Sequence, residues 1–340
     1  MTQIYPGIWF YKPSIAAAVI FGIIFLALTA IHTYQLVRTR AWHWLPFVLG
    51  GYCETAAYFA RAVGATQYPS FTLVPYIVYV VLALGAPTLF AASMYMDLRK
   101  IVRLTEGEKH LPISARLLTP AFVVADLVCF CLIFAGMSTV CIVFEHCRLT
   151  FPGAGTLSAQ THSSNDLADD IIIVGLALQI VVLILFVTVS VMFEGRMNTS
   201  PTAKVFNNKD LPWQKHTYNL YTSSFIIILR CGFRIAQFGQ GQNYYWYLVG
   251  NEWCVYVFDG LFMLGVMLLF GYVHPSEVNA LLGRHDLYVK HFLKFRRVKP
   301  QDRLASFAMP IHLQQFMVVQ GQVQKAEESS VQVSALGVSV

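Results

Sequence analysis

The fold is decided by the residues from Leu220 to Phe238, which read LYTSSFIIILRCGFRIAQF. The stretch is long enough to cross a bilayer as a helix, and it is largely apolar apart from Arg230 and Arg234. These arginines stand one helical turn apart and share a face. Hydrocarbon does not tolerate two bare guanidinium groups, so the segment must face the inside of a helical bundle that supplies counter-charges. Buried charge of this kind usually marks a pathway or a binding site.

The composition of the chain is that of a membrane protein. Of its 340 residues, 56% are hydrophobic and 12% are charged, and the mean hydropathy is +0.55. A soluble domain carries about a quarter charged residues. The net charge of +6 does not indicate a nucleic-acid partner, because the basic residues are confined to one set of loops.

Seven apolar runs of membrane-spanning length follow one another along the chain. Each is too long for a strand of a soluble core and contains few charges. We therefore predict an all-α integral membrane protein that forms a bundle of seven transmembrane helices. The runs cover residues 14–37, 44–64, 72–96, 117–140, 170–193, 218–238 and 253–273.

The loops between these runs predict the orientation of the bundle. The segment before the first run and the loops after the second, fourth and sixth contain two basic residues, Lys12 and Arg148. Of the 24 basic residues three more lie inside runs, which leaves 19 for the other loops and the tail. Positive residues stay cytoplasmic, so we predict the N-terminus outside and the C-terminus in the cytoplasm. The sequon Asn198-Thr199-Ser200 is then expected to carry no glycan.

We divide the chain into four parts. Residues 1–13 are predicted to form a short extracellular N-terminus, 14–275 the transmembrane domain, 276–313 a basic juxtamembrane segment and 314–340 a disordered cytoplasmic tail. The juxtamembrane segment is partly amphipathic, and two interpretations stay open: contact with anionic lipid of the inner leaflet, or an ordinary basic flank of a span. The lipid contact would be made by Lys290, Lys294, Arg296 and Arg297.

Charged residues inside the predicted helices lie at matching depths. At about 1.5 Å per residue, Arg61, Arg230 and Arg234 lie about 5 to 12 Å below the outer surface. Glu252 is at the outer rim, and Asp259, seven residues on and on the same face, is about 10 Å deep. Other candidates lie deeper along their helices: Glu54, which shares a face with Arg61, then Asp126 and Gln179.

The near-neutral sum of these charges predicts ion pairs between the second, sixth and seventh helices. An unpaired charge at mid-membrane costs at least about 3 kcal/mol. Two interpretations stay open. The pairs either only fix the order of the helices, or they line a polar cavity that opens outward and holds the head group of an amphipathic ligand. Arginine suits the second role, because its planar fork binds phosphate or carboxylate through two hydrogen bonds.

Other kinds of site lack the residues that they need. The sequence has no Walker-type glycine loop for ATP, no lysine inside a predicted helix for a retinal Schiff base, and no Gly-x-Ser-x-Gly elbow for a serine hydrolase. It also has no histidine pair at the spacing of an intramembrane zinc site. We therefore expect no enzyme activity, no metal and no cofactor.

The cysteines give little chemical information. None of the seven belongs to a CxxC pair, and Cys129 and Cys131 point to different faces of a helix. Cys141 and Cys147 fall at the predicted outer rim, where a disulfide and two free thiols are both open.

Several short motifs together resemble the fungal RTA-like family of seven-span membrane proteins, also called lipid-translocating exporters. The resemblance covers roughly residues 10–280. Members usually carry glutamate where this chain has Gln237, and tend to carry glutamine at the place of Tyr79. The matching motifs are Gly51-Tyr52 with Glu54, Tyr58 and Arg61, then Ala86-Pro87, Ala91-Ala92, Tyr95, Asp126, Gly175-Leu176, Gln179, Arg230, Phe233-Arg234, Gln240-Gly241, Glu252, Tyr256, Phe258-Asp259 and His274-Pro275.

The resemblance implies a fungal protein of the plasma membrane, or of the vacuole or another endomembrane. It also implies a link to the export or release of sphingoid long-chain bases and to resistance against toxic amphiphiles. We expect a lipid or amphiphile transporter that is not driven by ATP. A cationic base would pair with Glu252 or Asp259, and the arginines would bind a phosphate. The alternative is a seven-helix sensor of lipid asymmetry or stress, with the same cavity as its ligand site.

Overall fold

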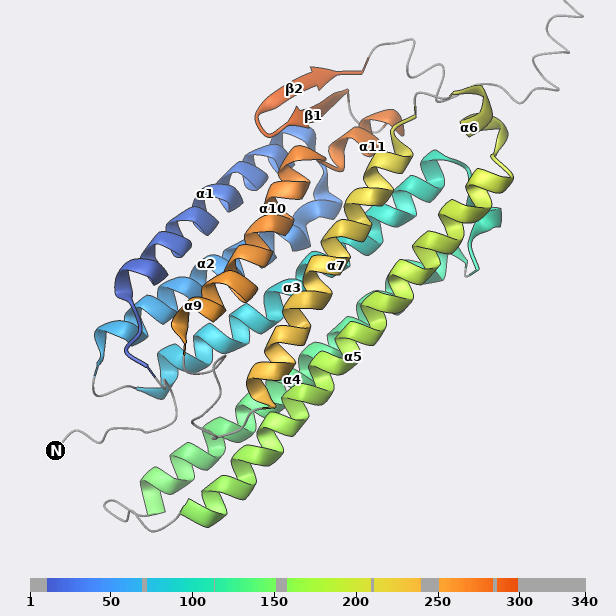
Figure 1. Cartoon of the computed structure of the whole chain (residues 1–340). Coiled ribbons are helices and arrows are strands. Elements are labelled where there is room, and N and C mark those ends of the chain that lie inside the picture. The colour runs from blue at the N-terminus through green and yellow to red at the C-terminus, as the bar shows by residue number, and fades with distance from the viewer. Residues whose placement is uncertain are drawn as a thin grey trace, which may run out of the picture.

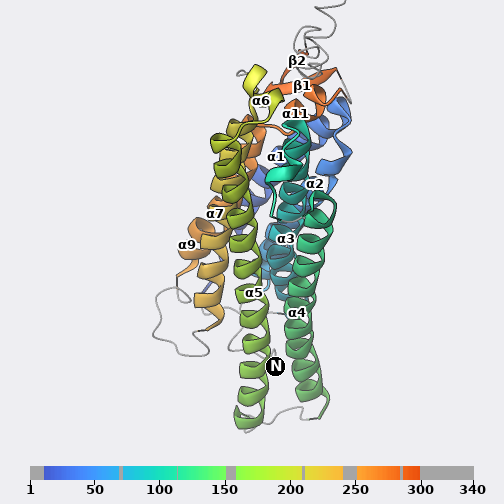
Figure 2. The ribbon, with the colours of Figure 1, turned by 90° about the vertical axis from the view of Figure 1, so that its right-hand side faces the viewer.

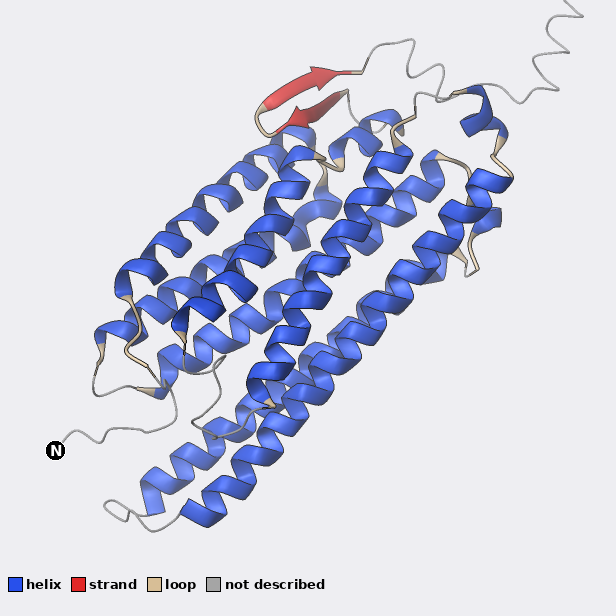
Figure 3. Cartoon of the chain, viewed as in Figure 1, coloured by secondary structure: helices blue, strands red, loops and turns tan. Residues whose placement is uncertain are grey.

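A computed structural model of the chain describes residues 11–68, 72–112, 114–150, 158–208, 211–239, 251–283 and 286–298. Long helices dominate these residues, and one small hairpin follows the last helix (Figure 3). The long helices are α1 Ile15–Thr39, α2 Leu45–Thr66, α3 Leu73–Leu104, α4 Ala115–Thr150, α5 Ser158–Thr199, α7 Trp213–Phe238, and a last helix made of α9 Glu252–Val255, a π-helical turn Tyr256–Leu261 and α10 Phe262–Tyr272. The short elements are η1 Trp42–Trp44, η2 Glu108–His110, α6 Ala203–Asn207, α11 Ser276–Leu281, β1 Leu287–His291 and β2 Lys294–Arg297.

Local sequence sets the bounds of the first helices. The hydroxyl of Ser14 accepts a hydrogen bond from the N–H of Ala17 at 3.3 Å and caps the start of α1. At the other end Arg40 has φ 48°, a left-handed conformation that ends the helix. Pro46 stands in the first turn of α2, where its missing N–H costs no hydrogen bond.

The long helices lie side by side and alternate in direction (Figures 1 and 2). Helix α2 packs against α1 and α3, α4 packs against α3 and α5, and α7 packs against α5 and α10. One end of the bundle carries β1, β2, α6 and α11, and we call it the hairpin end. We call the opposite end, where α1 begins, the far end.

The protein is an integral membrane protein of helical construction. Within the described residues, five helices are long and apolar enough to cross a bilayer: Ile15–Thr39, Val74–Leu104, Arg116–Thr139, Leu167–Thr199 and Glu252–Leu281. Helices α2 and α7 have 22 and 26 residues but do not belong to this group. They contain Glu54, Arg61, Arg230 and Arg234, which are at most 1% exposed.

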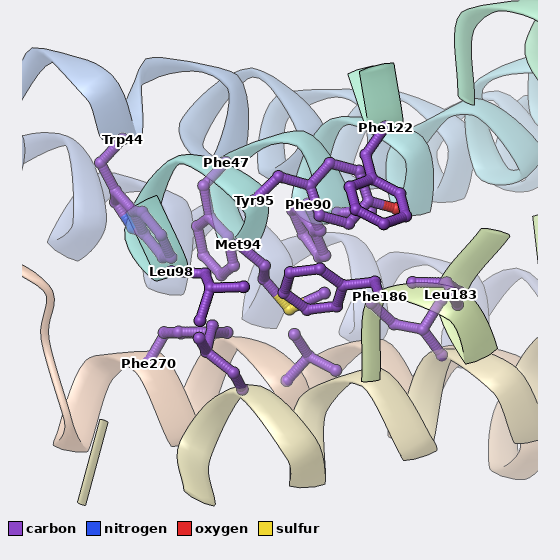
Figure 4. Close-up of a cluster of buried hydrophobic side chains, with 14 of the residues drawn as sticks. Trp44, Phe47, Phe90, Met94, Tyr95, Leu98, Phe122, Leu183, Phe186 and Phe270 are labelled. Atoms are coloured by element: carbon purple, nitrogen blue, oxygen red, sulfur yellow. The ribbon is translucent and has the colours of Figure 1, made fainter. Parts of the chain in front are cut away.

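Aromatic side chains fill the centre of the bundle towards the hairpin end (Figure 4). Phe47 stacks on Phe90 with ring centroids 4.3 Å apart, and Trp44 lies 4.5 Å from Phe47 and 4.8 Å from Phe270. Farther along, Tyr95 packs edge-on against Phe186. Between helices in lipid the hydrophobic effect is weak, so close packing of this kind supplies much of the association energy.

Four helices are longer than the sequence predicts, and one of them, α7, begins at Trp213 instead of near 218. Helix α3 continues to Leu104 instead of ending near 96, and α4 and α5 have 36 and 42 residues. Helices α4 and α5 run past the others at the far end (Figure 1). The predicted bounds followed the hydropathy, but a helix does not end where polar residues begin, because its backbone hydrogen bonds continue. The side chains of Cys141 and Cys147 lie outside the described part.

The segment that we predicted to be a basic juxtamembrane segment contains a β-hairpin, so the fold is not purely α-helical. Strands β1 and β2 pair antiparallel, and Phe292 turns between them with φ 43°. The hairpin is bonded to the bundle: the N–H of Phe292 donates to Gly271 at 2.9 Å and its carbonyl accepts from Gln35 at 2.7 Å. Val289, a β-branched residue, is buried below it. Sequence periodicity indicated an amphipathic segment but could not predict these docking contacts.

Two glycines let α4 and α5 approach closely. A Cβ at Gly136 would lie 2.8 Å from the backbone oxygen of Ala168 and 2.6 Å from Ile172. A Cβ at Gly175 would lie 3.1 Å from the oxygen of Cys129. Such small residues are typical of tightly packed membrane helices.

We expect Gly136→Ala to lower the stability of the protein by about 1–3 kcal/mol, because the backbone of α5 cannot move aside without loss of packing. Thermal unfolding in detergent measures the effect. The matched control is Gly232→Ala in α7, where nothing lies within 4 Å of the added carbon. Equal melting temperatures for the two variants would contradict the close approach.

Candidate functional site

Asp259 stands between two arginines of α7. Its carboxylate lies 2.6 Å from Nε of Arg230 and 2.5 Å from Nη2 of Arg234, and Nε of Arg234 donates to it at 3.1 Å. All three residues are at most 1% exposed. The arginines are one turn apart on α7, and Asp259 lies in the π-helical turn Tyr256–Leu261. π-helical turns are rare and occur frequently at functional sites.

A second ion pair lies at the far end of the bundle. Nη2 of Arg61 lies 3.2 Å from the carboxylate of Glu252, and the hydroxyl of Tyr256 accepts from Arg61 at 3.2 Å and donates to Glu252 at 3.1 Å. Glu252 also accepts the backbone N–H of Ser14 at 2.9 Å. This pair therefore joins α2, the last helix and the start of α1.

Tyr79 of α3 connects the two ion pairs. Its hydroxyl accepts a hydrogen bond from Nη2 of Arg234 at 3.2 Å. The guanidinium of Arg61 lies 5.0 Å from the centroid of its ring, a cation–π distance. We call the connected set the arginine cluster. It consists of Glu54, Arg61, Tyr79, Arg230, Arg234, Glu252, Tyr256 and Asp259.

Glu54 is the least satisfied member of the arginine cluster. It is 0% exposed, and its nearest ion-pair partner, Nη2 of Arg230, is 3.7 Å away. That Nη2 donates to the backbone oxygen of Ala83 at 2.6 Å. Within the described residues, both carboxylate oxygens of Glu54 and the Nη1 atom of Arg230 lack a hydrogen-bond partner. Burying a carboxylate without hydrogen bonds costs free energy, so a proton or a ligand bound at Glu54 would be stabilised.

The structure thus brings most of the predicted site residues together. Three arginines, Arg61, Arg230 and Arg234, face the three carboxylates of Glu54, Glu252 and Asp259, so the formal sum is zero. Arg61 is bonded to Glu252 and not to Asp259, and Tyr79 makes the connection.

Two predicted candidates lie apart from the arginine cluster. Asp126 of α4 accepts a hydrogen bond from Tyr95 of α3 at 2.8 Å, deep in the aromatic packing. Gln179 of α5 lies 3.8 Å from the sulfur of Cys231. Both are buried, so they join neighbouring helices through hydrogen bonds between polar side chains.

A second group of charges, partly buried and at the hairpin end, was not predicted from the sequence. Nε2 of His216 lies 3.1 Å and Nζ of Lys215 3.2 Å from the carboxylate of Glu277. Lys100 of α3 donates to Asn279 of α11. We call this set, with the 1% exposed Asp97, the hairpin-end cluster. The signal in the sequence was the three-residue spacing of Asp97 and Lys100, which continues one face of α3 beyond the apolar run.

A family model described as RTA1-like protein matches residues 47–280, from the first turn of α2 into α11, and so contains both clusters. The chain belongs to the RTA1-like family. No solved structure matches it.

Three relatives of this RTA1-like chain are fungal. Protoporphyrin uptake protein 1 of Saccharomyces cerevisiae is 26% identical over 77% of this chain and 90% of its own length. Protein RTA1 of the same yeast is 28% identical over 68% of this chain and 65% of its own length. The probable lipid transporter atnI of Emericella nidulans is 24% identical over 80% of this chain and 68% of its own length.

Two residues that differ from the expected family pattern contact the same side chain of this RTA1-like protein. Gln237 accepts a hydrogen bond from Nη1 of Arg234 at 3.1 Å, and Tyr79 accepts one from Nη2. Both neutral groups occupy donors of Arg234 without adding charge. Among the described residues, Asp259 is therefore the carboxylate that forms an ion pair with this arginine.

We expect Asp259→Asn to destabilise the fold by several kcal/mol, because it leaves two buried arginines without their shared counter-charge. Melting in detergent, followed by tryptophan fluorescence, checks this. The control is Glu106→Gln, whose carboxylate is 67% exposed and pairs only at the surface with Lys204. An unchanged melting temperature for Asp259→Asn would show that the pair carries little stability.

Proposed function

We propose that this protein transports amphiphilic lipids across or between the leaflets of the membrane without an ATPase of its own. The observation that carries the proposal is the arginine cluster. It is a buried set of guanidinium and carboxylate groups of zero net charge, with unused hydrogen-bonding capacity at Glu54 and Arg230. Such a set suits a head group that is itself charged or zwitterionic. The names of two relatives, a probable lipid transporter and a protoporphyrin uptake protein, support movement of amphiphiles.

The proposed ligand is a sphingoid long-chain base or a related lipid. Its ammonium group would pair with a carboxylate of the arginine cluster, and the arginines would bind a phosphate where one is present. Glu252 is the accessible carboxylate, because its side chain is 17% exposed whereas Asp259 is engaged by both arginines. The protein would act in the plasma membrane, or in the vacuole or another endomembrane.

We further propose that α2 and α7 also cross the bilayer, which makes seven spans, and that the hairpin end is cytoplasmic. Both helices are long enough to cross, and their low hydropathy comes from residues turned inward. The basic residues of the loops gather at the hairpin end. There the basic hairpin residues would contact anionic lipid of the inner leaflet: Lys290, Lys294, Arg296 and Arg297.

The topology has a direct test at Asn198, which is exposed near the hairpin end. We expect no glycan on Asn198 in fungal cells, because a cytoplasmic sequon does not meet the glycosylation enzymes. Mass spectrometry of the purified protein measures whether Asn198 carries a glycan. As a positive control, a sequon placed in the N-terminal segment 1–10 should be glycosylated. Glycan on Asn198 would invert the proposed orientation.

One observation favours a sensor as the second candidate function. The β-hairpin is bonded to Gly271 of α10 and Gln35 of α1, so a movement of the last helix would be passed to a cytoplasmic element. A sensor would bind the same lipid at the arginine cluster but would not move it between leaflets.

Reconstitution into liposomes with a fluorescent long-chain base separates the two functions. We expect the protein to accelerate leaflet exchange of the probe, and Glu252→Gln to slow it, because the ammonium group loses its charge partner while the side chain keeps its shape. Glu106→Gln, at the exposed surface, should exchange as fast as the wild type. Exchange no faster than in protein-free liposomes would reject the transporter and leave the sensor.

A further inference from the structure

Three buried polar residues lead from Glu54 towards the hairpin end. Thr29 and His32 lie one turn apart on α1, and His274 follows α10; all are at most 1% exposed. The hydroxyl of Thr29 lies against α2 at Gly51, where an added Cβ would come within 2.5 Å of it. Gly51 is one turn from Glu54 on the hairpin-end side. Glu54 and Gly51 on α2, and Thr29 and His32 on α1, are each about one helical turn apart, about 5 Å, and the Thr29–Gly51 contact joins the two pairs into a row.

Hydrogen-bond partners assign the tautomers of the two histidines. Nε2 of His32 lies 3.0 Å from the carbonyl oxygen of Met267, which can only accept, so this nitrogen carries the hydrogen. Nδ1 of His274 accepts the N–H of Ser276 at 3.1 Å, so its hydrogen is on Nε2. The rings are stacked with centroids 6.3 Å apart. The structure describes no partner for the remaining nitrogens, an acceptor on His32 and a donor on His274.

Gln35 completes the surroundings of His32. Its amide nitrogen donates to the carbonyl of Phe292 at 2.7 Å, so its oxygen is left as an acceptor, and this oxygen has no partner among the described residues. Gln35 follows His32 by three residues on α1, so the two side chains share a face, and this oxygen can accept a hydrogen bond from a ring that has taken a second proton. His32 therefore has a ring nitrogen, Nδ1, that can take up a proton. The amide oxygen of Gln35 can then accept a hydrogen bond from the protonated ring, as a proton-carrying histidine requires.

The row reaches water at the hairpin end. His274 stands three residues before Glu277, whose backbone N–H donates to its carbonyl oxygen at 3.2 Å, and the charges of His43 from η1 and His216 from α7 act on its ring. His216 is bonded to Glu277, whose side chain is 19% exposed. At the other end of the row Glu54 interacts with Arg230 and Arg234 of α7 and with Asp259 of the π-helical turn. Relays of carboxylates and histidines across a membrane are typical of proton-linked transport.

We propose that His32 and Thr29, with bridging water that the Nε2–H of His274 holds, carry protons between the hairpin-end cluster and Glu54, and that protonation of Glu54 is coupled to exchange of a cationic amphiphile at the arginine cluster. This inference rests on the proposed transport function. A proton that moves inward leaves the carboxylate of Glu54, passes by way of Thr29 and water to Nδ1 of His32, and reaches water at His216 and Glu277 through the water that His274 holds.

The coupling follows from the charge of the arginine cluster. With Glu54 ionised the formal sum is zero, and with Glu54 protonated it is +1, because three arginines then face two carboxylates. In a medium of low dielectric constant one added charge at this distance repels an ammonium head group strongly. Proton and cation therefore exclude each other, and an inward proton gradient drives the cation outward.

The test uses the full chain in liposomes that contain a pH-sensitive dye, with a potassium diffusion potential to drive protons. We expect proton flux above that of protein-free liposomes, and its loss in His32→Asn, His274→Asn and Glu54→Gln. The asparagines retain a donor for Met267 and an acceptor for Ser276, so the melting temperature checks that the fold survives. His110→Asn, in η2 and outside the row, should keep the full flux; His32→Gln replaces His32→Asn if that variant does not fold.

Probe exchange measured in the same liposomes distinguishes the two proposals. A pH gradient should accelerate exchange of the fluorescent long-chain base in the wild type and not in Glu54→Gln. Exchange without proton flux, or flux that persists in folded His32 and His274 variants, would overturn the proton path and leave lipid transport intact. Proton flux lost in the variants, but with no probe exchange, would keep the path and reject the lipid substrate.

Discussion

The shared carboxylate of Asp259 is the constraint on which the rest of the bundle depends. Two arginines on one face of α7 cannot enter hydrocarbon unless a counter-charge meets them. Asp259 neutralises one of them, and Glu54 approaches the other charge of the pair. On α3, the backbone oxygen of Ala83 accepts a hydrogen bond from Arg230 and the hydroxyl of Tyr79 accepts one from Arg234. The position of α7 therefore fixes those of α2, α3 and the last helix.

The two charged ends of the bundle have different characters. In the arginine cluster every cation is an arginine, which stays charged under all conditions and holds its partners in fixed directions. In the hairpin-end cluster the cations are lysine and histidine, and Glu277 is partly exposed. The arginine cluster is held in fixed directions, whereas the hairpin-end cluster reaches water through Lys215 and Glu277, whose side chains are 40% and 19% exposed. Helices α3 and α7 take part in both, so a movement at one end is felt at the other.

The sequence predicted much of this arrangement, for reasons that particular residues make clear. Arg230 and Arg234 required a bundle, and depth along the helices brought Arg61, Glu252 and Asp259 to one end. Depth is only one coordinate, however, and rotation about each helix axis is set by packing. For that reason the sequence could not assign Arg61 to Glu252, nor separate Asp126, which packs with Tyr95. Asp97 was missed because hydropathy placed the end of α3 before it, although tertiary contacts keep it buried.

The π-helical turn Tyr256–Leu261 has a consequence for how such proteins diverge. A turn of this kind holds one residue more than an α-helix needs. Loss of one residue there would leave the helix continuous but would rotate everything before it by about 100° relative to everything after it. Glu252 would leave Arg61 while Asp259 kept both of its arginines. A single codon deletion or insertion can thus break the ion pair at the far end and leave the pairs of Asp259 intact, so related chains can differ at one end of the bundle without losing the contacts that hold α7.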